Sequence, residues 1–339
     1  MEKIDWDNLG FNVVETRSMY KGICRKGEEW KLGGLIPYGT IELSPAAGVL
    51  NYGQGCFEGT KAYRTVKDRV VLFRPEMNAK RMALSTKRLC IPEMNQEYFL
   101  NAVEETLKDN IDYVPPYGKG SLYIRPIVWG TSPALGVKPV EVYTFMVFVS
   151  PVGPYFKGDI QPLNLKVSNK YHRAAPKGIG NAKAIGNYSA SLLPLIEAKN
   201  SGFDEVIYLN AKDEEFVEEV GSANLFVLTG NTIKTPKLDG SILPGITRDS
   251  VITLAKDTIG LEVLETNVTL TELYDADEVF CTGTAVVVTP VGNITGLDGK
   301  HKIADGKMGQ LTSKLRKLLT GIQRGDVSDE FGWLYPIKE

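Results

Sequence analysis

The sequence contains few residues of the types that build metal sites, disulfide frameworks and histidine-based catalysis. Among its 339 residues are four cysteines and only two histidines, His172 and His301. The cysteines, at positions 24, 56, 90 and 281, show no C-x-x-C spacing. That pattern argues against a zinc site or a disulfide framework and fits a reducing cytoplasm. If the protein is an enzyme, we therefore expect a lysine or a carboxylate, rather than a histidine, to move protons.

The sequence also lacks a long apolar run and a strong excess of charge of either sign. No apolar run reaches the roughly 20 residues that a membrane-spanning helix needs. The first residues lack the basic segment and apolar core of a signal peptide. The formal net charge of −2 gives no reason to expect nucleic acid or an acidic membrane surface as a partner. These features predict a cytoplasmic protein with neither a membrane nor a nucleic acid as partner.

The length and the order of the predicted elements indicate two domains. In the first half we predict strands at 11–16, 69–73, 121–126 and 142–149, and helices at 75–89 and about 96–111. The second half alternates strands with helices, and its last helix is predicted at about 308–323. We place an N-terminal domain at 1–170, a linker at 171–180 and a C-terminal domain at 181–339.

Lys183 lies among glycines and other small residues in the stretch 177–193, and an apolar run that predicts a helix follows it. Tyr188 comes five positions later, about one and a half turns if the segment is helical. A planar ligand can approach such a lysine closely, and an enclosed amine becomes nucleophilic toward carbonyls because desolvation lowers its pKa. The alternative is a glycine-rich loop that leads into a core helix, with Lys183 in solvent.

Four other features admit both a structural and a functional interpretation. The glycine-dense stretch 51–63 is either a tight turn or a backbone that lies close to a ligand. Arg81 adjoins the apolar stripe of a predicted helix and Arg125 lies within an apolar strand, and each is either exposed to solvent or placed to meet an anion. Thr247 is a candidate cap of a helix after Pro244-Gly245, and the N-terminus of such a helix also binds phosphate readily.

Seven segments, in the same order along the chain, resemble the branched-chain-amino-acid aminotransferases, which are class IV, fold-type IV enzymes that use pyridoxal 5′-phosphate. The resemblance covers nearly the whole chain. The segments are FEGTKAY at 57–63, FRPEMNAKRM at 73–82, SLYIRP at 121–126, KAIGNY at 183–188, EVGSAN at 219–224, LPGITR at 243–248 and TGTA at 282–285.

The resemblance implies a two-domain fold of the α+β or α/β class. A smaller N-terminal α/β domain would be followed by a larger C-terminal domain with a mixed, barrel-like sheet that bears the reactive lysine. This sequence departs from the family pattern at two places. Ser222-Ala223 stands where relatives have Thr-Met, and the turn at Thr284 lacks the C-x-x-C of mammalian members, so a thiol–disulfide switch is not expected there.

The resemblance also implies how the cofactor would be bound. Lys183 would be the Schiff-base lysine and the proton carrier. Glu219 would pair with the pyridine nitrogen, and Tyr188 would hydrogen-bond the phenolate oxygen. The rest of the cofactor, chiefly its phosphate, would be held by Arg81, Ser222, the backbone at Ile246 and Thr247, and Thr284.

For the substrate, the resemblance implies a carboxylate site at Tyr123, Thr284 and Ala285, with Arg125 receiving a distal carboxylate. The side-chain pocket would comprise Phe11, Phe57 and Tyr155, with Tyr52, Leu135 and Val137 contributed by the other protomer of an obligatory homodimer. The implied reaction is a ping-pong transfer of the amino group of L-leucine, L-isoleucine or L-valine to 2-oxoglutarate. The alternatives are a D-amino-acid aminotransferase, an aminodeoxychorismate lyase and a non-catalytic protein that binds the cofactor. No metal is expected.

Overall fold

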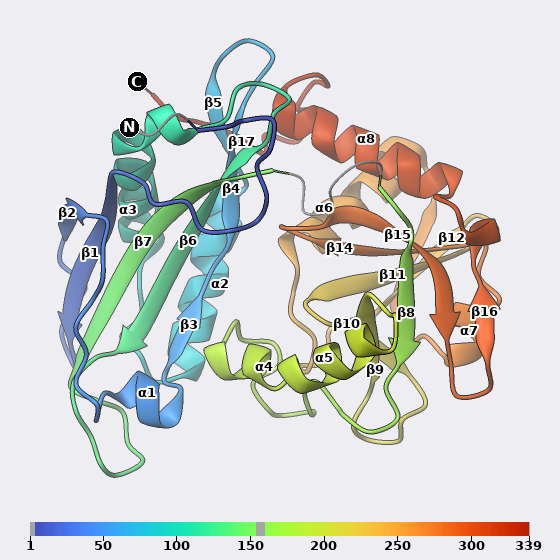
Figure 1. Ribbon diagram of the computed structural model, residues 1–339, viewed down its shortest axis with the longest axis horizontal. Coiled ribbons are helices and arrows are strands. Elements are labelled where there is room, and N and C mark those ends of the chain that lie inside the picture. The colour runs from blue at the N-terminus through green and yellow to red at the C-terminus, as the bar shows by residue number, and fades with distance from the viewer. Residues whose placement is uncertain (1–3, 154–159, 339) are drawn as a thin grey trace. The chain divides into compact units, whose positions relative to one another are not determined.

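The computed structural model describes residues 4–153 and 160–338, and the chain divides into two compact units (Figure 1). The first unit comprises Met1–Tyr155, Ala182–Ile185 and Gly321–Glu339, and the second comprises Phe156–Asn181 and Gly186–Thr320. This division differs from the predicted one, because Lys183 belongs to the first unit, where Ala184 pairs with Cys56. With its two additional segments the first unit is also the larger, whereas the resemblance implied a smaller N-terminal domain.

An antiparallel sheet forms the framework of the first unit, with strand order β17-β5-β4-β6-β7-β1-β2 and with β3 paired to β6. The predicted strands at 69–73, 121–126 and 142–149 are confirmed, and the last two are longer than predicted. The strands are β1 Ser18–Arg25, β2 Gly34–Pro37, β3 Gly55–Phe57, β4 Thr60–Arg64, β5 Val70–Phe73, β6 Ser121–Gly130, β7 Val142–Val152 and β17 Leu334–Pro336.

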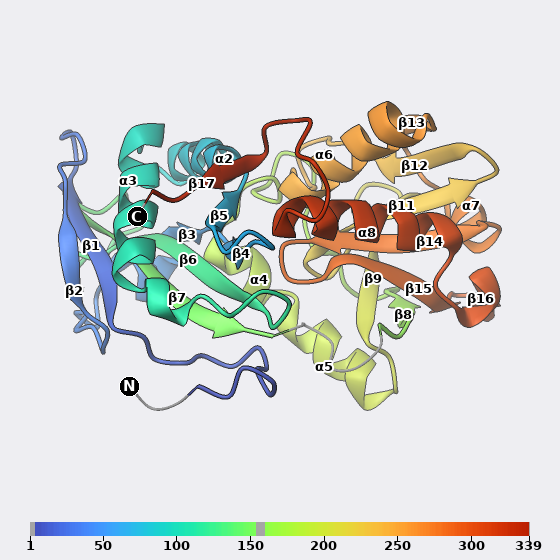
Figure 2. The ribbon, with the colours of Figure 1, turned by 90° about the horizontal axis from the view of Figure 1, so that it is seen from above.

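Two amphipathic helices cover one face of this sheet (Figure 2), and both confirm the predicted positions. Pro75 occupies the first turn of α2, and the Asn95 side chain caps α3 by accepting a hydrogen bond from the backbone N–H of Tyr98 (2.7 Å). Apolar side chains such as Phe99 on α3 and Phe145 on β7 form one buried core. The helical segments are α1 Gly48–Tyr52, α2 Pro75–Arg88, α3 Gln96–Asp109 and the short 3₁₀-helix Ile111–Tyr113.

The strand predicted at 11–16 is wrong, because this segment binds to β7 through side chains instead of a backbone ladder. The backbone N–H of Val14 donates to Ser150 Oγ (2.9 Å), and Thr16 Oγ1 donates to the carbonyl of Val149 (3.3 Å). Alternating apolar residues do not reveal whether the partner of a segment is a strand edge or a hydroxyl group.

The sheet of the second unit contains a closed ring of strands. Its order is β10-β9-β8-β15-β14-β11, and the pairing of β10 with β11 closes the ring, while β12 and β13 extend the sheet from β11. Strand β8 is parallel to both β9 and β15, whereas β14 is antiparallel to β11 and β15. This ring confirms the predicted mixed, barrel-like sheet. The strands are β8 Leu163–Val167, β9 Glu205–Leu209, β10 Val217–Val220, β11 Ala223–Thr229, β12 Thr232–Pro236, β13 Glu262–Thr266, β14 Glu278–Gly283, β15 Val287–Thr295 and β16 Lys300–Lys302.

The apolar run after Lys183 forms two short helices, α4 and α5, where the sequence predicts one. Pro194 lies in the first turn of α5, where its ring would clash with the carbonyl of residue 190 in a continuous helix. No helix in the described part of the chain is long and apolar enough to cross a bilayer. The helical segments of this half of the chain are α4 Ile185–Ser189, α5 Leu192–Asn200, α6 Ile246–Thr253 with the π-helix Leu254–Ile259, α7 Leu270–Tyr274, the 3₁₀-helix Ala304–Gly306 and α8 Gln310–Arg324.

Helix α8 lies beside β14 (Figure 2). The carboxylate of Glu278, the first residue of β14, attaches the helix to the barrel. Glu278 Oε1 accepts from the backbone N–H of Leu311 (2.9 Å), and Oε2 accepts from the N–H (2.8 Å) and the hydroxyl (2.7 Å) of Thr312. The first N–H groups of a helix have no partner within it and carry a positive partial charge. Glu278 therefore satisfies the helix start and fixes its position on β14.

We predict that Glu278→Gln lowers the free energy of unfolding by about 1–3 kcal/mol, because an amide group would then face backbone donors and leave one of them unpaired. Thermal and urea denaturation would measure the change. Glu215→Gln, at an exposed carboxylate of the same unit, serves as the matched control. Equal stability of the two variants would contradict this account of α8.

Candidate active site

The backbone around Lys183 is fixed by β3 and α2. The backbone N–H of Phe57 donates to the carbonyl of Lys183 (3.1 Å), and the N–H of Lys183 donates to Ser85 Oγ (3.0 Å). The side chain is half-buried, and its Nζ lies 5.0 Å from the centre of the Phe57 ring. Lys183 is therefore not a fully solvated loop residue. A positioned amine of this kind can act as a nucleophile or as an acid–base group.

A fully buried carboxylate, Glu58, lies close enough to Lys183 to interact with its charge. Arg81 binds this carboxylate through two parallel hydrogen bonds, from Nε to Oε1 (2.7 Å) and from Nη2 to Oε2 (2.8 Å), and Asn78 Nδ2 donates to Oε2 (2.8 Å). Burial alone would raise the pKa of Glu58, but Arg81, with smaller contributions from Lys183 and Asn78, holds it below its ordinary value. Arg81 is thus a buried, oriented cation and not the solvated residue of the structural alternative.

Arg125 and three aromatic rings form a cluster on the first unit. The guanidinium carbon of Arg125 lies 4.7 Å from the centre of the Phe57 ring, and Nη2 donates to the hydroxyl of Tyr123 (2.9 Å). Phe11 packs edge-on against Tyr123, with ring centres 5.5 Å apart. A Cβ at Gly59 would lie 2.2 Å from the Tyr123 hydroxyl, so glycine leaves room for this hydroxyl. Phe57 thus contacts two cations, Lys183 and Arg125.

The residues predicted to serve the other protomer lie on α1 and in the loop between β6 and β7. The hydroxyl of Tyr52 donates to the carbonyl of Leu135. The side chains of Leu135 and Val137 are 89% and 88% exposed, which is unusual for two apolar residues in one loop. Tyr155, the remaining predicted pocket residue, lies outside the described residues.

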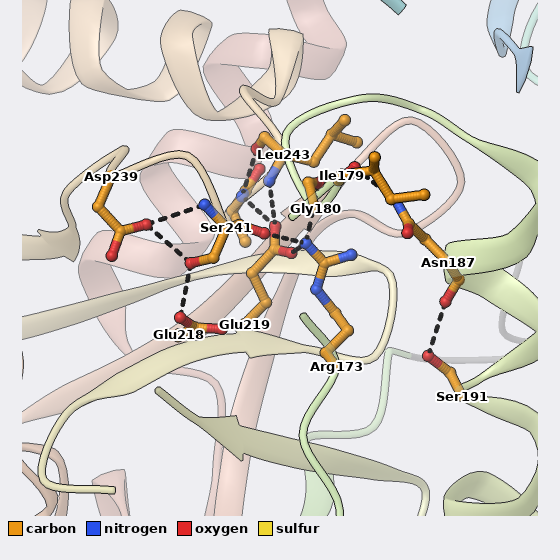
Figure 3. A network of polar contacts seen from close by, with 11 residues as sticks. Arg173, Ile179, Gly180, Asn187, Ser191, Glu218, Glu219, Asp239, Ser241 and Leu243 are labelled. Carbon is orange, nitrogen blue, oxygen red and sulfur yellow. Dashed lines mark hydrogen bonds and ion pairs between the residues drawn. The ribbon is translucent and has the colours of Figure 1, made fainter. Parts of the chain in front are cut away.

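In the second unit, Glu219 is buried at the end of β10 within a network of polar contacts (Figure 3). Its Oε2 forms an ion pair with Arg173, and its Oε1 accepts from Asn224 Nδ2 (2.8 Å) and from the backbone N–H of Leu243 (3.2 Å). Nη2 of Arg173 also contacts the carbonyls of Gly180 (3.2 Å) and Ser241 (2.8 Å). Glu219 is therefore a paired, buried carboxylate and not a solvated turn residue.

Asn224 connects this network to the start of α6. Gly245 is the N-terminal cap of that helix, so the predicted cap, Thr247, is instead its second residue. Glycine suits position 245 because a Cβ there would lie 2.0 Å from Asn224 Oδ1. Ile246 and Thr247 are both buried, and their backbone N–H groups belong to the first turn of α6, where a helix favours anions.

The barrel register places two predicted turns beside this network. Asn224 pairs with Glu219 on β10 and with Thr282 on β14. The exposed Ser222 consequently lies on the turn before β11, and the half-buried Thr284 and Ala285 lie on the turn that joins β14 to β15. Tyr188 is half-buried on α4, where its carbonyl accepts from the backbone N–H of Ser191 (3.2 Å).

The predicted site residues thus fall into two groups, one on each unit. The first unit contributes Phe11, Tyr52, Phe57, Arg81, Tyr123, Arg125, Leu135, Val137 and Lys183, and the second contributes Tyr188, Glu219, Ser222, Ile246, Thr247, Thr284 and Ala285. Across the described ranges, no three side chains of His, Cys, Asp or Glu are arranged to hold a metal ion.

Among the polar residues of these networks that the sequence interpretation missed are Glu58, Arg173 and Asn224. Each lies inside a segment that was singled out or next to one, and each is buried with a charged or amide partner. A charged residue flanked by glycine and apolar residues, as Glu58 is between Phe57 and Gly59, is a sequence signal of a buried pair, whereas Arg173 follows His172 and lacks that signal. That signal does not identify the partner.

Known proteins are similar to this chain over most of its length. The family model for amino-transferase class IV matches residues 55–294. The branched-chain amino acid aminotransferase 2, chloroplastic, of Humulus lupulus is 49% identical over 330 residues, which is 97% of this chain and 81% of that protein. A methionine aminotransferase of Arabidopsis thaliana is 42% identical over 98% of this chain and 94% of its own length, so the names of the relatives are not uniform.

Solved structures show the same fold. The branched-chain amino acid aminotransferase of Escherichia coli has a TM-score of 0.82 at 30% identity, covering 96% of this chain and 100% of that one. The branched-chain aminotransferase of the thermophilic archaeon Thermoproteus uzoniensis, solved with norvaline, has a TM-score of 0.79 at 30% identity, covering 95% of this chain and 100% of that one.

The predicted cytoplasmic location is wrong by comparison with these relatives. The Humulus lupulus protein is named chloroplastic, and other relatives from that plant and from Arabidopsis thaliana are named chloroplastic or mitochondrial. Scattered, unpaired cysteines indicate a reducing environment, and they do not distinguish one reducing compartment from another. Family, by contrast, is settled by the match over most of the chain and by relatives of nearly half identity: this protein belongs to the class IV aminotransferases.

Proposed function

We propose that this protein transfers the amino group of L-leucine, L-isoleucine or L-valine to 2-oxoglutarate, giving the branched 2-oxo acids and L-glutamate. The observation that carries this proposal is the set of aromatic and cationic side chains around Lys183. The Phe57 ring lies beside the amine, Arg125 lies over the same ring, and the Arg125 guanidinium binds the Tyr123 hydroxyl. Such a wall suits an apolar side chain and, in the second half of the reaction, the distal carboxylate of glutamate. The names of the relatives support the same substrates.

Class IV aminotransferases depend on pyridoxal 5′-phosphate, the cofactor predicted from the sequence. When bound, it supplies the electron sink through which the amino group is exchanged. The residues fit this group chemically: a half-buried amine at Lys183, a buried carboxylate at Glu219 and the first turn of α6 as an anion site.

Lys183 is proposed to bind the cofactor and to carry the substrate proton. Its Nζ would move the proton between the substrate Cα and the cofactor carbon that bears the exchanged amino group. The neighbouring Phe57 ring would stabilise the protonated amine by about 0.5–2 kcal/mol through a cation–π contact. Because hydrogen bonds from β3 and to α2 fix the backbone, only side-chain torsions need to change between these positions.

The ionised carboxylate of Glu219 is proposed to bind the protonated pyridine nitrogen of the cofactor. Tyr188 is proposed to donate a hydrogen bond to the phenolate oxygen. An unpaired buried carboxylate would tend to take up a proton and lose its charge. Arg173 and the two donors on Oε1 oppose that change. The phosphate would be held by Arg81, by the backbone N–H groups of Ile246 and Thr247, and by Thr284, with Ser222 contributing its hydroxyl to the cofactor.

The substrate carboxylate is proposed to bind at Tyr123, Thr284 and Ala285, with Phe11, Phe57 and Tyr155 around the side chain. The homodimer is also a proposal, in which Tyr52, Leu135 and Val137 serve the other protomer. It is supported by the exposure of Leu135 and Val137 and by an apolar groove on the sheet face opposite α2 and α3. Met19, Trp129, Met146 and Phe148 are among the residues that line this groove. Exposed apolar residues that gather on one face can mark a site of protein–protein contact.

The first test is amino-group transfer to 2-oxoglutarate, measured as L-glutamate formed from L-leucine, L-isoleucine, L-valine, L-methionine or D-alanine. We expect the three branched-chain substrates to have the highest kcat/KM. Lys183→Ala should lose at least about 10²–10⁴-fold in rate, the range for removing a positioned acid–base group. Lys199→Ala, at an exposed lysine, should retain activity. Preference for D-alanine would favour the D-amino-acid aminotransferase alternative, and preference for L-methionine would refute the branched-chain assignment.

The Arg173–Glu219 pair gives a second prediction. Arg173→Met leaves the buried Glu219 carboxylate without its cation and should destabilise the protein by about 3–5 kcal/mol, as measured by denaturation. The double variant Arg173→Met/Glu219→Met should regain much of that stability, because no buried charge remains, yet it should not transaminate. Arg69→Met, at an exposed arginine, is the control. A stable single variant with full activity would rule out the proposed role of the pair.

The proposed dimer gives a third prediction. Leu135→Asp should leave the folded protomer intact but raise the dissociation constant of the dimer by at least about 30-fold, since replacing a central interface side chain costs about 2 kcal/mol or more. Sedimentation velocity over a concentration series would measure this. Leu297→Asp changes a side chain that is 61% exposed elsewhere and should have no effect. Dimers of unchanged affinity in Leu135→Asp would place the interface elsewhere.

A further inference from the structure

The turn that joins β14 to β15 ends in a strained backbone conformation. Val287, the first residue of β15, has φ of +62°. A β-branched side chain disfavours this left-handed region strongly, so a valine there is a conformational outlier. Such strain persists only where surrounding contacts impose it, and it is found most often at functional sites.

The local sequence does not favour this turn. Gly283 and Val287 are paired residues of β14 and β15, which leaves Thr284, Ala285 and Val286 as a three-residue loop. Loops of this length usually close with glycine or asparagine in the left-handed conformation. Valine at that position means that the turn needs support from elsewhere in the chain.

Arg316 on α8 supplies that support. Its Nη1 donates to the carbonyl of Val286 (3.2 Å) and to the carbonyl of Val288 (2.5 Å), the two residues that flank Val287. The hydroxyl of the buried Thr289 also donates to the Val286 carbonyl (2.8 Å). One cationic nitrogen therefore binds the backbone on both sides of the strained residue, with hydrogen bonds of the stronger, charge-assisted kind.

Arg316 is itself held in place from β14. Glu278, at the start of that strand, binds the backbone and hydroxyl of Thr312, which lies one helical turn before Arg316. Helix α8 is thus attached near its start to one end of β14, and its next turn binds the loop at the other end of the same strand.

We infer that Arg316 is a positioning residue, which holds the turn Thr284–Val286 in the strained conformation that directs Thr284 and Ala285 toward bound anions. The inference rests on the proposed function, in which these two residues bind the cofactor phosphate and the substrate carboxylate. Without Arg316, Val287 would relax toward an ordinary β conformation, and the turn would rotate away from that orientation.

The test compares Arg316→Met with Arg316→Met/Val287→Gly. In the single variant, we expect KM for L-leucine and 2-oxoglutarate, and the dissociation constant of pyridoxal 5′-phosphate from the cofactor-free protein, to rise about tenfold, the effect of losing one well-placed hydrogen bond. The kcat at saturation should stay within about twofold. Glycine adopts the left-handed conformation without strain, so the double variant should regain most of the lost affinity.

Hydrogen exchange of the amides of residues 284–288 gives a readout that needs no activity. Exchange should be faster in Arg316→Met than in wild type and should slow again in the double variant. This measurement tests the turn even if the wild-type protein fails to transaminate leucine, so failure of the proposed function and failure of this inference are distinguishable. Lys317→Met, at the exposed neighbouring residue of α8, is the matched control.

Val287→Gly alone should keep KM within about twofold of wild type, because Arg316 still holds the turn. The inference is overturned if Arg316→Met behaves like Lys317→Met in affinity and exchange. It is also overturned if Arg316→Met lowers thermal stability and affinity together while the added glycine restores neither, since Arg316 would then be a general structural contact.

Discussion

The second unit depends on the need to compensate one buried carboxylate. Glu219 is 3% exposed, and removing such a charge from water is tolerable only with excellent pairing. The partners come from three separate segments: Arg173 after β8, Asn224 on β11 and the backbone of Leu243 before α6. Arg173 in turn binds the carbonyl of Gly180, three residues before Lys183. The need to pair the Glu219 charge therefore fixes the segments that bear most of the predicted site residues of the second unit.

The first unit solves the same physical problem with a second buried pair. Glu58 has no exposed surface, and Arg81 meets both of its oxygens in a bidentate geometry that only a guanidinium can provide. The pair joins the segment after β3 to α2, and Lys183 binds the same helix through Ser85, one turn after Arg81. Packing alone would allow these segments to slide, whereas two parallel hydrogen bonds define one position.

Local signals predicted most of the fold, and long-range contacts explain what they missed. The helices after Pro75 and Asn95, and the β-prone runs on either side of residue 130, were identified because capping and periodicity are local. The segment 11–16 failed because Ser150, far along the chain, takes the place of a strand partner. Thr247 is not the cap because the helix already begins at Ile246, after Gly245, which lies against the Asn224 side chain. The Lys183 and Glu219 segments were recognised by resemblance, whereas Arg173, their structural complement, required the folded chain.

Strand β11 provides the common reference for these features. Asn224 lies opposite Glu219 on one neighbouring strand and opposite Thr282 on the other, and its Oδ1 abuts Gly245 at the start of α6. A shift of β11 by one residue would reverse the faces of its side chains and would displace the carboxylate, the helix start and the β14–β15 turn together. The strained Val287 lies at the end of the same set of pairings, because β14 pairs with β11 through Thr282 and with β15 through Gly283 and Val287. Arg316 then acts on the one part of this assembly whose local sequence favours another conformation.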